Sequence, residues 1–255
     1  MFIDTHTHLY LNDFNEDRNE IIAEALNLNI KKLFLPNIDS STIDDLIKLC
    51  EQNTSICYPM IGLHPCSVNK NFQEELNNLF TYLKKTNPIA IGEIGIDLYW
   101  DKTNLNEQIE AFIEQIKWAK DYNLPIVIHA RDSYKEIFDV LDEMNDDNLF
   151  GVFHCFSSSL VDAQHILDYG GFKLGIGGVV TFKNAGLDKI LSKIPLENIV
   201  LETDSPYLTP APYRGKRNKS SYIALIAKKI SEIYNLKISE IEKITTKNAC
   251  EIFKF

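Results

Sequence analysis

Eight short runs of apolar residues recur along this chain, and amphipathic segments separate them. The runs follow one another at roughly 25 to 35 residues, about the length of one strand plus one helix. Nearly continuous apolar strands that alternate with helices are typical of a parallel sheet covered by helices. The runs are Met1–Thr5, Lys32–Pro36, Tyr58–Leu63, Ile89–Gly92, Pro125–Ile128, Phe150–Phe153, Gly171–Ile176 and Ile199–Leu201. Eight such units predict an α/β fold whose strands close into a (β/α)8 TIM barrel.

The segments between the runs have the period of helices. In the stretch 105–122, one face carries Ile109, Phe112, Ile113, Ile116 and Ala119. Asn104 is of a residue type that caps helix N-termini, and Pro125 ends the helix and opens the next strand. The stretch Asp17–Leu28 shows a similar period. We find no linker and no repeat beyond the strand–helix unit, so residues 1–255 are predicted to form a single barrel domain.

Composition narrows the class of protein. Apolar residues make up 45% of the chain, which suits a large core and not a disordered segment. No stretch approaches the ~20 apolar residues of a membrane helix, and the N-terminus lacks the basic and apolar regions of a signal peptide. The 5 cysteines have no metal-ligand spacing and are predicted to be reduced thiols. We therefore expect a cytoplasmic protein without membrane association, and no protein partner can be inferred.

The net charge of −10 argues at first against a polyanionic substrate. Bound divalent ions, however, would add positive charge where the chemistry takes place. The charge is also uneven, because the segment Tyr213–Lys219 carries four cations and no acid. The composition therefore permits an enzyme that acts on nucleic acid, and it disfavours a protein that coats DNA through a wide basic face.

Residue types that bind metals follow five of the predicted strands. Parallel strands bring their C-terminal ends to one mouth, where barrel enzymes have their active sites. The residues are His6, His8, Glu93, His129, His154 and Asp204. A lone histidine in such a place is more often structural. Four histidines and two carboxylates at one mouth, however, predict a metal site.

Local spacing supports this site. His6 and His8 are two residues apart, so both point to the same side of an extended chain. Imidazole and carboxylate ligands suit zinc, manganese or a similar ion, and no thiolate is needed. Glu93 has two carboxylate oxygens and can bridge two ions. Glu202 stands two residues before Asp204, and we expect it to orient a ligand rather than to bind metal itself.

Five further residues around the predicted mouth are candidates for substrate binding. His64 follows the third strand, and a substrate contact competes there with a structural role. Arg131 follows the fifth strand on the ligand side. Arg214, Lys216 and Arg217 belong to a loop stiffened by prolines. Guanidinium groups in such a loop can clamp phosphates, although a charge run is usually only a solvated surface.

The remaining candidates have more ordinary interpretations. His165 lies in a helical segment and is expected to be incidental. Cys155 and Cys66 are interpreted as buried thiols. Trp100 and Trp118 are interpreted as packing residues; for Tyr99 and Trp100, which follow the fourth strand, stacking on a nucleobase is the alternative.

Eight motifs that include these residues occur in order along the chain. They are Asp-Thr-His-Thr-His (4–8), Gly-Leu-His-Pro (62–65), Gly-Glu-Ile-Gly-Ile-Asp (92–97), His-Ala-Arg-Asp (129–132), His-Cys-Phe-Ser (154–157), Val-Thr-Phe-Lys-Asn-Ala (180–185), Glu-Thr-Asp-Ser-Pro (202–206) and Pro-Tyr-Arg-Gly-Lys-Arg-Asn (212–218). Together they resemble the TatD family of metal-dependent deoxyribonucleases, which belongs to the amidohydrolase-like barrels. The likeness spans essentially the whole chain.

The resemblance implies a role for each ligand candidate. One divalent ion would be held by His6, His8, Glu93 and Asp204. A second would be held by Glu93, His129 and His154. The family hydrolyses DNA phosphodiesters, often as an exonuclease, and the two ions would be Mg²⁺, Mn²⁺ or Zn²⁺. The chain departs from the family pattern at Ser158, Lys219 and Ser220, which leaves the substrate preference open and touches no predicted ligand.

We therefore expect hydrolysis of DNA by a metal-bound water, with Asp204 as general base and Glu93 as the second catalytic residue. One alternative is an RNA- or aminoacyl-tRNA-directed hydrolase. Another is a small-molecule amidohydrolase or lactonase, although many of those enzymes have a carboxylated lysine where this chain has Glu93. A non-catalytic barrel is disfavoured because all six ligand positions are present.

Overall fold

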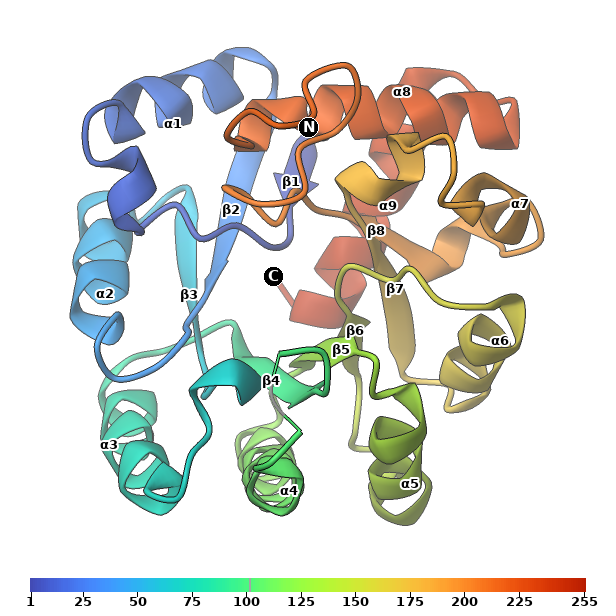
Figure 1. The fold of residues 1–255 in the computed structure, drawn as a ribbon. Helices are drawn as coiled ribbons and strands as arrows, with labels where there is room; N and C mark the ends of the chain where they lie inside the picture. Colours follow the sequence, from blue (N-terminus) through green and yellow to red (C-terminus); the bar gives the residue numbers. More distant parts are fainter. Residues whose placement is uncertain (101) are drawn as a thin grey trace.

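The computed structural model describes residues 1–100 and 102–255. Its eight strands form one parallel sheet in the order β1 to β8, with helices around the outside (Figure 1). The strands are β1 (Phe2–Asp4), β2 (Ile30–Pro36), β3 (Cys57–Ile61), β4 (Ala90–Asp97), β5 (Ile126–Arg131), β6 (Gly151–Phe153), β7 (Phe172–Ile176) and β8 (Ile199–Leu201). This is the (β/α)8 TIM barrel that the apolar runs predict.

The helices between the strands follow the predicted alternation. The α-helices are α1 (Arg18–Asn27), α2 (Ile43–Gln52), α3 (Phe72–Lys85), α4 (Leu105–Tyr122), α5 (Tyr134–Met144), α6 (Leu160–Asp168), α7 (Leu187–Leu191), α8 (Ile223–Tyr234) and α9 (Ile238–Phe253). The short 3-10 helices are η1 (Asn12–Phe14), η2 (Pro65–Ser67), η3 (Gly178–Thr181), η4 (Leu196–Asn198) and η5 (Ser220–Tyr222). The end of α9 lies behind the centre of the barrel (Figure 1).

The barrel closes between its first and last strands through hydrogen bonds just beyond their ends. Thr5 N donates to Leu201 O at 3.1 Å, and Asp204 N donates to His6 O at 2.9 Å. These bonds place the residues that follow β1 beside those that follow β8, although they come from opposite ends of the sequence. This closure therefore brings His6 and His8, which follow β1, next to Asp204, which follows β8.

The barrel interior has an apolar layer near the N-terminal ends of the strands. Seven strands contribute one residue each, and the end of α9 packs onto them. The layer consists of Ile3, Phe34, Met60, Ala90, Val127, Val152 and Val200, with Ala249, Ile252 and Phe253 from α9. Two residues after Val127 and after Val152 stand His129 and His154. Strand alternation therefore turns both histidines to the inside, one layer nearer the mouth.

Strands β4 and β5 run further than the sequence predicts. The prediction ended β4 at Gly92, yet Ile94–Asp97 continue to pair with β5, so Glu93 lies within the strand. The register of this pairing shifts between Ile91 and Ile94. Alternation from Ala90 would turn Glu93 outward, and the shift brings it to the inner side. The continuation depends on pairing with β5, which a local pattern cannot reveal.

Two buried glutamines of α4 bond the backbone at the ends of neighbouring strands. Gln115 Oε1 accepts a hydrogen bond from Leu63 N at 2.6 Å. Gln108 Oε1 accepts one from Asp97 N at 2.8 Å, and its Nε2 donates to Asp97 O at 3.2 Å. The glutamines are seven residues apart, about two helical turns, so they share a face of α4. They satisfy backbone groups where the ladders of β3 and β4 end.

The five cysteines are free thiols, as predicted. Cys66 is exposed and Cys155 is only partly buried, so the interpretation of both as buried thiols is wrong. Cys66 lies in η2, shortly after β3, and Cys155 follows the end of β6 by two residues. No helix within residues 1–100 and 102–255 is long and apolar enough to cross a membrane. The cytoplasmic location stays a prediction.

Replacing Gln115 with Met should lower the free energy of unfolding by about 1–3 kcal/mol, because it leaves a buried backbone N–H without an acceptor. Urea denaturation followed by circular dichroism measures this. Gln164→Met, at an exposed position on α6, is the matched control and should stay within about 0.5 kcal/mol of the wild type. Equal effects of the two substitutions would contradict the role given to Gln115.

Candidate metal centre

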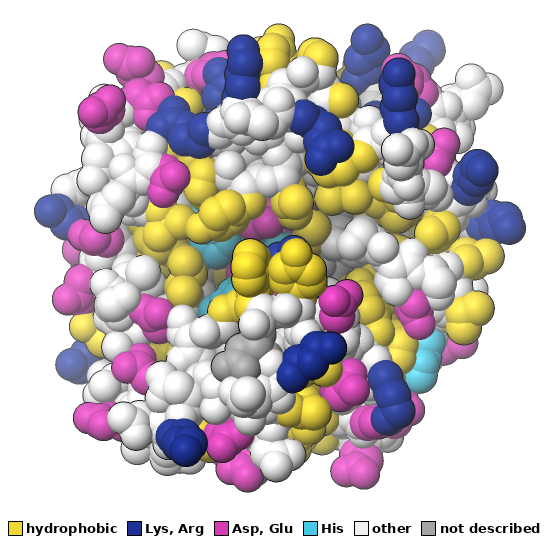
Figure 2. Space-filling model, viewed as in Figure 1, with side chains coloured by type: hydrophobic (Ala, Val, Ile, Leu, Met, Phe, Trp, Pro, Cys, Tyr) yellow, Lys and Arg dark blue, Asp and Glu magenta, His cyan; other side chains and the backbone are white. Residues whose placement is uncertain are grey.

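The C-terminal ends of the strands surround a hollow in the molecular surface. Figure 2 shows histidine and acidic side chains at its depth and hydrophobic side chains around its rim. The polar side chains at the bottom are buried, among them His6 at 0% and Glu93 at 2% exposure. Buried ionisable groups require partners, and the partners here are one another.

One carboxylate oxygen of Glu93 faces the residues that follow β1 and β8. Its Oε2 lies 3.1 Å from His6 Nε2 and 3.6 Å from His8 Nε2. Asp204 Oδ1 lies 3.7 Å and 3.6 Å from the same two nitrogens. His6, His8 and Glu93 are close enough together to hold one metal ion. The closure of the barrel thus assembles a first group of nitrogen and oxygen donors.

The other carboxylate oxygen of Glu93 faces a second group of imidazoles. Its Oε1 lies 2.8 Å from His129 Nδ1, 3.0 Å from His154 Nε2 and 3.4 Å from His64 Nε2. His64, Glu93 and His129 are also close enough to hold an ion. His64 therefore lies inside the cluster, whereas the sequence suggested it as a substrate contact at the mouth. Imidazole and carboxylate donors of this kind fit first-row divalent ions.

Two side chains that the sequence analysis passed over orient histidines of the cluster. Tyr10 OH donates to Pro36 O at 2.8 Å and lies 3.1 Å from His8 Nδ1, so it accepts the Nδ1 proton. Asp97 Oδ2 lies 2.8 Å from His129 Nε2 and accepts its proton. Each histidine therefore directs its other ring nitrogen toward Glu93, where an ion can bind in place of a proton, as it does on metal-binding imidazoles. Tyr10 follows His8 by two residues, and this spacing was the available signal.

Glu202 lies beside His154 at the edge of the cluster. Its Oε1 accepts a hydrogen bond from Cys155 N at 2.5 Å and lies 3.3 Å from His154 Nδ1. Its Oε2 is buried and has no hydrogen-bond partner within residues 1–100 and 102–255. A Cβ at Gly175 would stand 2.3 Å from that oxygen, so a larger residue there would displace the Glu202 carboxylate. A buried carboxylate oxygen without a partner favours positive charge nearby, such as a cation bound in the cluster, and His6, His154 and Glu202 form a third close group.

Asp4 joins the ends of β1 and β8 beneath the cluster. It is fully buried. Its Oδ1 accepts from Thr203 N at 2.9 Å, and its Oδ2 accepts from Thr203 Oγ1 at 2.7 Å. Burial raises the pKa of Asp4 to about 7 in spite of these bonds. Because Thr203 precedes Asp204, Asp4 positions a residue of the first donor group.

The cluster shifts the pKa of its own members. Burial opposes ionisation of Glu93, but His154, His64 and His6 hold the pKa of Glu93 well below its ordinary value. Burial likewise opposes the charged form of His154, yet Glu93 and Glu202 raise the pKa of His154 well above its usual range. The pKa of His129 is also raised: burial opposes its charged form, and Asp97 and Glu93 favour it. Without metal, protons therefore compensate the buried carboxylates.

Comparison with known proteins agrees with this geometry. A family model described as TatD related DNase matches residues 3–254. This chain belongs to the TatD family of metal-dependent hydrolases. The resemblance stated from the motifs is thereby confirmed.

TatD relatives match over almost their whole length. The uncharacterized metal-dependent hydrolase YabD of Bacillus subtilis (strain 168) is 36% identical over 255 residues, which cover 100% of this chain and 99% of YabD. An uncharacterized metal-dependent hydrolase of Buchnera aphidicola subsp. Acyrthosiphon pisum is 33% identical, with 98% of each chain covered. The crystal structure of YjjV, a TatD homologue from Escherichia coli K12, has a TM-score of 0.93 at 28% identity and covers 100% of this chain and 98% of its own.

The cationic loop of this TatD protein is divided between its surface and α1. Arg214 is exposed and stacks on Phe182, with 4.0 Å between its guanidinium carbon and the ring centroid. Lys216 is also exposed. Arg217 instead forms an ion pair with Asp17 at the start of α1. Arg214 and Lys216 are therefore accessible to a ligand, whereas Arg217 ties the loop to the barrel wall.

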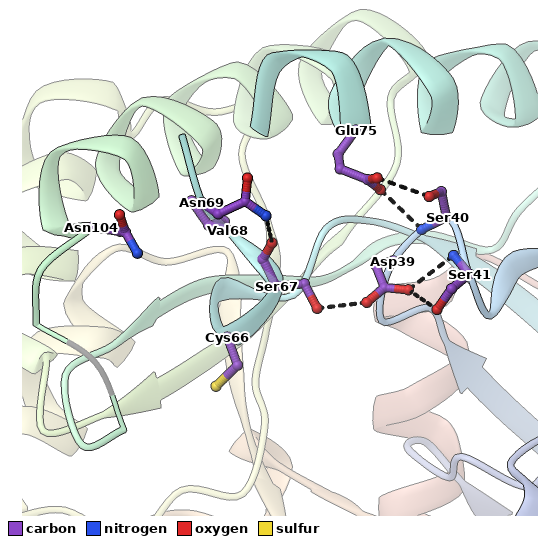
Figure 3. A pocket seen from close by; sticks show the side chains of 9 residues that line it. All are labelled: Asp39, Ser40, Ser41, Cys66, Ser67, Val68, Asn69, Glu75 and Asn104. Atoms are coloured by element: carbon purple, nitrogen blue, oxygen red, sulfur yellow. Dashed lines mark hydrogen bonds between the residues drawn. The ribbon is translucent and has the colours of Figure 1, made fainter. Parts of the chain in front are cut away.

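A polar pocket of about 450 Å³ lies on the rim between the loops that follow β2 and β3 (Figure 3). It is lined by Asp39, Ser40, Ser41, Cys66, Ser67, Val68, Asn69, Glu75 and Asn104. Its carboxylates already accept hydrogen bonds: Asp39 from Ser41 and Ser67, and Glu75 from Ser40. These bonds brace the two loops. The metal cluster does not line this pocket.

Metal affinity should rise with pH. The raised pKa values of His129 and His154 keep protons on these rings in the metal-free protein, and an ion must displace them. Below those pKa values, the Kd for Zn²⁺ should fall about tenfold per pH unit for each displaced proton. Above them, the competition from protons ends. Calorimetric titrations in buffers of different ionisation enthalpy count the protons. A pH-independent Kd without proton release would contradict this electrostatic account.

Asp97→Asn should weaken metal binding about 10- to 100-fold with the fold intact. An amide can still accept from backbone N–H groups, but its NH₂ would donate to His129 Nε2 and leave the ring proton on Nδ1. That proton then occupies the nitrogen that faces Glu93. Zn²⁺ titration against a chelator measures the loss, with Asp142→Asn on the outer surface as the matched control. Unchanged affinity in Asp97→Asn would show that Asp97 does not set the tautomer.

Proposed function

We propose that this TatD-family hydrolase cleaves phosphodiester bonds of DNA, as an exonuclease, with two divalent ions. The observation that carries the proposal is the position of Glu93, whose two carboxylate oxygens face two separate groups of donors. Paired ions that share a carboxylate are a recurrent arrangement in phosphatases and nucleases. Mg²⁺, Mn²⁺ and Zn²⁺ all remain candidates for the ions.

The residues that would hold the ions follow from the two groups around Glu93. The first set is His6, His8, Glu93 and Asp204. The second set is Glu93, His129 and His154, with His64 adjacent to them. When bound, such ions lower the pKa of a coordinated water and neutralise charge on phosphate oxygens. Tyr10, Asp97 and Glu202 hold histidines of these sets in orientation, and in this proposal Glu202 does so from outside the coordination sphere.

Asp204 is the group we assign as proton acceptor. Burial opposes its ionisation, but His8, His154 and His6 keep the pKa of Asp204 below its ordinary value, so the carboxylate is charged at neutral pH. The bond from its backbone N–H to His6 O fixes its position. Asp204 can therefore accept a proton from the attacking water while its other partners hold it in place. No covalent intermediate on the protein is required.

The phosphate backbone of the substrate would meet the cations of the rim. Arg131 and Arg214 are exposed and have planar guanidinium groups suited to phosphate oxygens. Lys216 would add charge beside Arg214. We assign Arg217 to the same site through its ion pair with Asp17, which holds the cationic loop at the mouth. Because only a few cations are accessible at the rim, the site suits a short stretch of substrate better than a long duplex.

The test uses metal-stripped protein and a 5′-labelled single-stranded oligonucleotide, with Mg²⁺, Mn²⁺ or Zn²⁺ added back. We expect a ladder of shortened products that appears only with metal. Asp204→Asn and Glu93→Gln should each lower kcat by about 100-fold or more, as loss of a general base or a shared ligand does.

Asp142→Asn is the matched control, because Asp142 pairs with His165 on the outer surface. It should keep wild-type turnover. An active Asp204→Asn variant would refute the assigned base. If no ion restores cleavage in folded, metal-binding protein, the DNA assignment is wrong, and lactone, amide and charged-tRNA substrates are tested next.

A further inference from the structure

Two aromatic side chains that directly follow β4 are unusually accessible. Trp100 is 69% exposed and Tyr99 is 53% exposed. Their rings meet edge to face with centroids 4.9 Å apart. The other tryptophan, Trp118, is only 5% exposed. An aromatic ring left in water forfeits the stabilisation that its burial would bring, so an exposed pair at the mouth calls for a ligand. The prediction of Trp118 as a packing residue is confirmed, and that of Trp100 is wrong.

A single carboxylate ties this pair to the metal centre. Asp97 Oδ1 accepts hydrogen bonds from the backbone N–H groups of Tyr99, at 2.9 Å, and Trp100, at 3.1 Å. Asp97 Oδ2 meanwhile accepts the proton of His129 Nε2. The backbone of the aromatic pair is therefore fixed relative to a candidate metal ligand. A group that stacks on these rings would therefore be held at a fixed position relative to His129.

A cation stands on the same pair of rings. The guanidinium carbon of Arg131 lies 3.9 Å from the Tyr99 ring centroid and 5.4 Å from that of Trp100. Within residues 1–100 and 102–255, no carboxylate lies at ion-pair distance from Arg131. Arg131 follows His129 by two residues in β5, so both side chains leave the strand on the same side. Among the described residues no acid occupies its donors, so they can bind an anion beside the metal centre.

We propose that Trp100 and Tyr99 form a platform on which one unpaired nucleobase stacks, while Arg131 binds the phosphate next to that base. The proposal rests on the proposed function, since it takes nucleic acid as the substrate. Every base has a π-face that an indole can stack on, and a neighbouring cation matches the charged backbone. Bases inside a duplex are already stacked on each other. The platform therefore selects single-stranded ends or unpaired nucleotides.

The first experiment is a double-mutant cycle between Trp100 and a base. Wild type, Trp100→Ala and Trp100→Phe are assayed on a single-stranded oligonucleotide and on copies in which one nucleotide near the scissile bond is abasic. In the wild type, one abasic position should raise KM about 5- to 100-fold. Trp100→Ala should have a raised KM on the intact oligonucleotide and a much smaller abasic penalty, because only Tyr99 remains to stack on the base. Trp100→Phe should keep an intermediate abasic penalty.

Tyr122→Ala is the matched control, because Tyr122 is an exposed aromatic residue at the end of α4. It should keep the full abasic penalty. Zn²⁺ affinity should be equal in Trp100→Ala and the wild type, which separates loss of stacking from damage to the metal centre. An abasic penalty of the same size in Trp100→Ala and the wild type would overturn the platform, as would a wild type without any penalty.

The second experiment measures binding without turnover. A short oligothymidylate is titrated into metal-loaded Asp204→Asn protein while tryptophan emission is followed. Trp118 is buried, so quenching by the oligonucleotide reports on Trp100, and Trp100→Phe should abolish it. Quenching without any cleavage by the wild type would refute the proposed function and leave the platform standing. Binding without quenching would overturn the platform alone, and absence of binding would overturn both.

Discussion

The buried carboxylate of Glu93, held between imidazoles on two sides, is the interaction on which the rest of the site depends. A charge in the interior is tolerated only with close, well-aligned partners. The barrel supplies these partners from four different strand ends. One carboxylate oxygen of Glu93 faces His6, and the other faces His129 and His154. Parallel strands that end at one mouth are the reason that residues so distant in sequence reach one carboxylate. The same density of donors makes the centre suitable for divalent ions.

A surrounding layer of side chains keeps these donors in place. Tyr10 and Asp97 each bond a histidine on the side away from Glu93, and Glu202 Oε1 lies 3.3 Å from His154 Nδ1. The chain also leaves the barrel sharply at the mouth: Cys155 and Asp204, just after β6 and β8, have φ angles of 48° and 57°. Left-handed backbone at residues other than glycine costs about 1–3 kcal/mol. Such strain persists because the barrel closure and the buried network determine the positions of these residues.

Much of this could be predicted from local pattern. The apolar runs gave the number of strands because burial on both faces requires continuous apolarity. The histidines could be assigned to one mouth because parallel topology leaves no other arrangement. Three features could not be predicted. Gly92 resembled a strand end, although β4 continues through pairing with β5. Gln108 and Gln115 resembled ordinary helix surface, although they bond strand backbone. Asp97 stood in a recognised motif, but its partner His129 lies in another strand.

The sequence by itself determined the eight-unit barrel and the types of ligand at its mouth, because both depend on residue spacing along single strands and helices. Only the tertiary structure decided which way those ligands face. The shift between β4 and β5 turns Glu93 inward, against the alternation of its own strand. The contact between α1 and the cationic loop pairs Arg217 with Asp17 and leaves Arg214 exposed. Each of these outcomes depends on contacts between segments far apart in sequence, and such contacts leave no period or spacing that can be found along the chain.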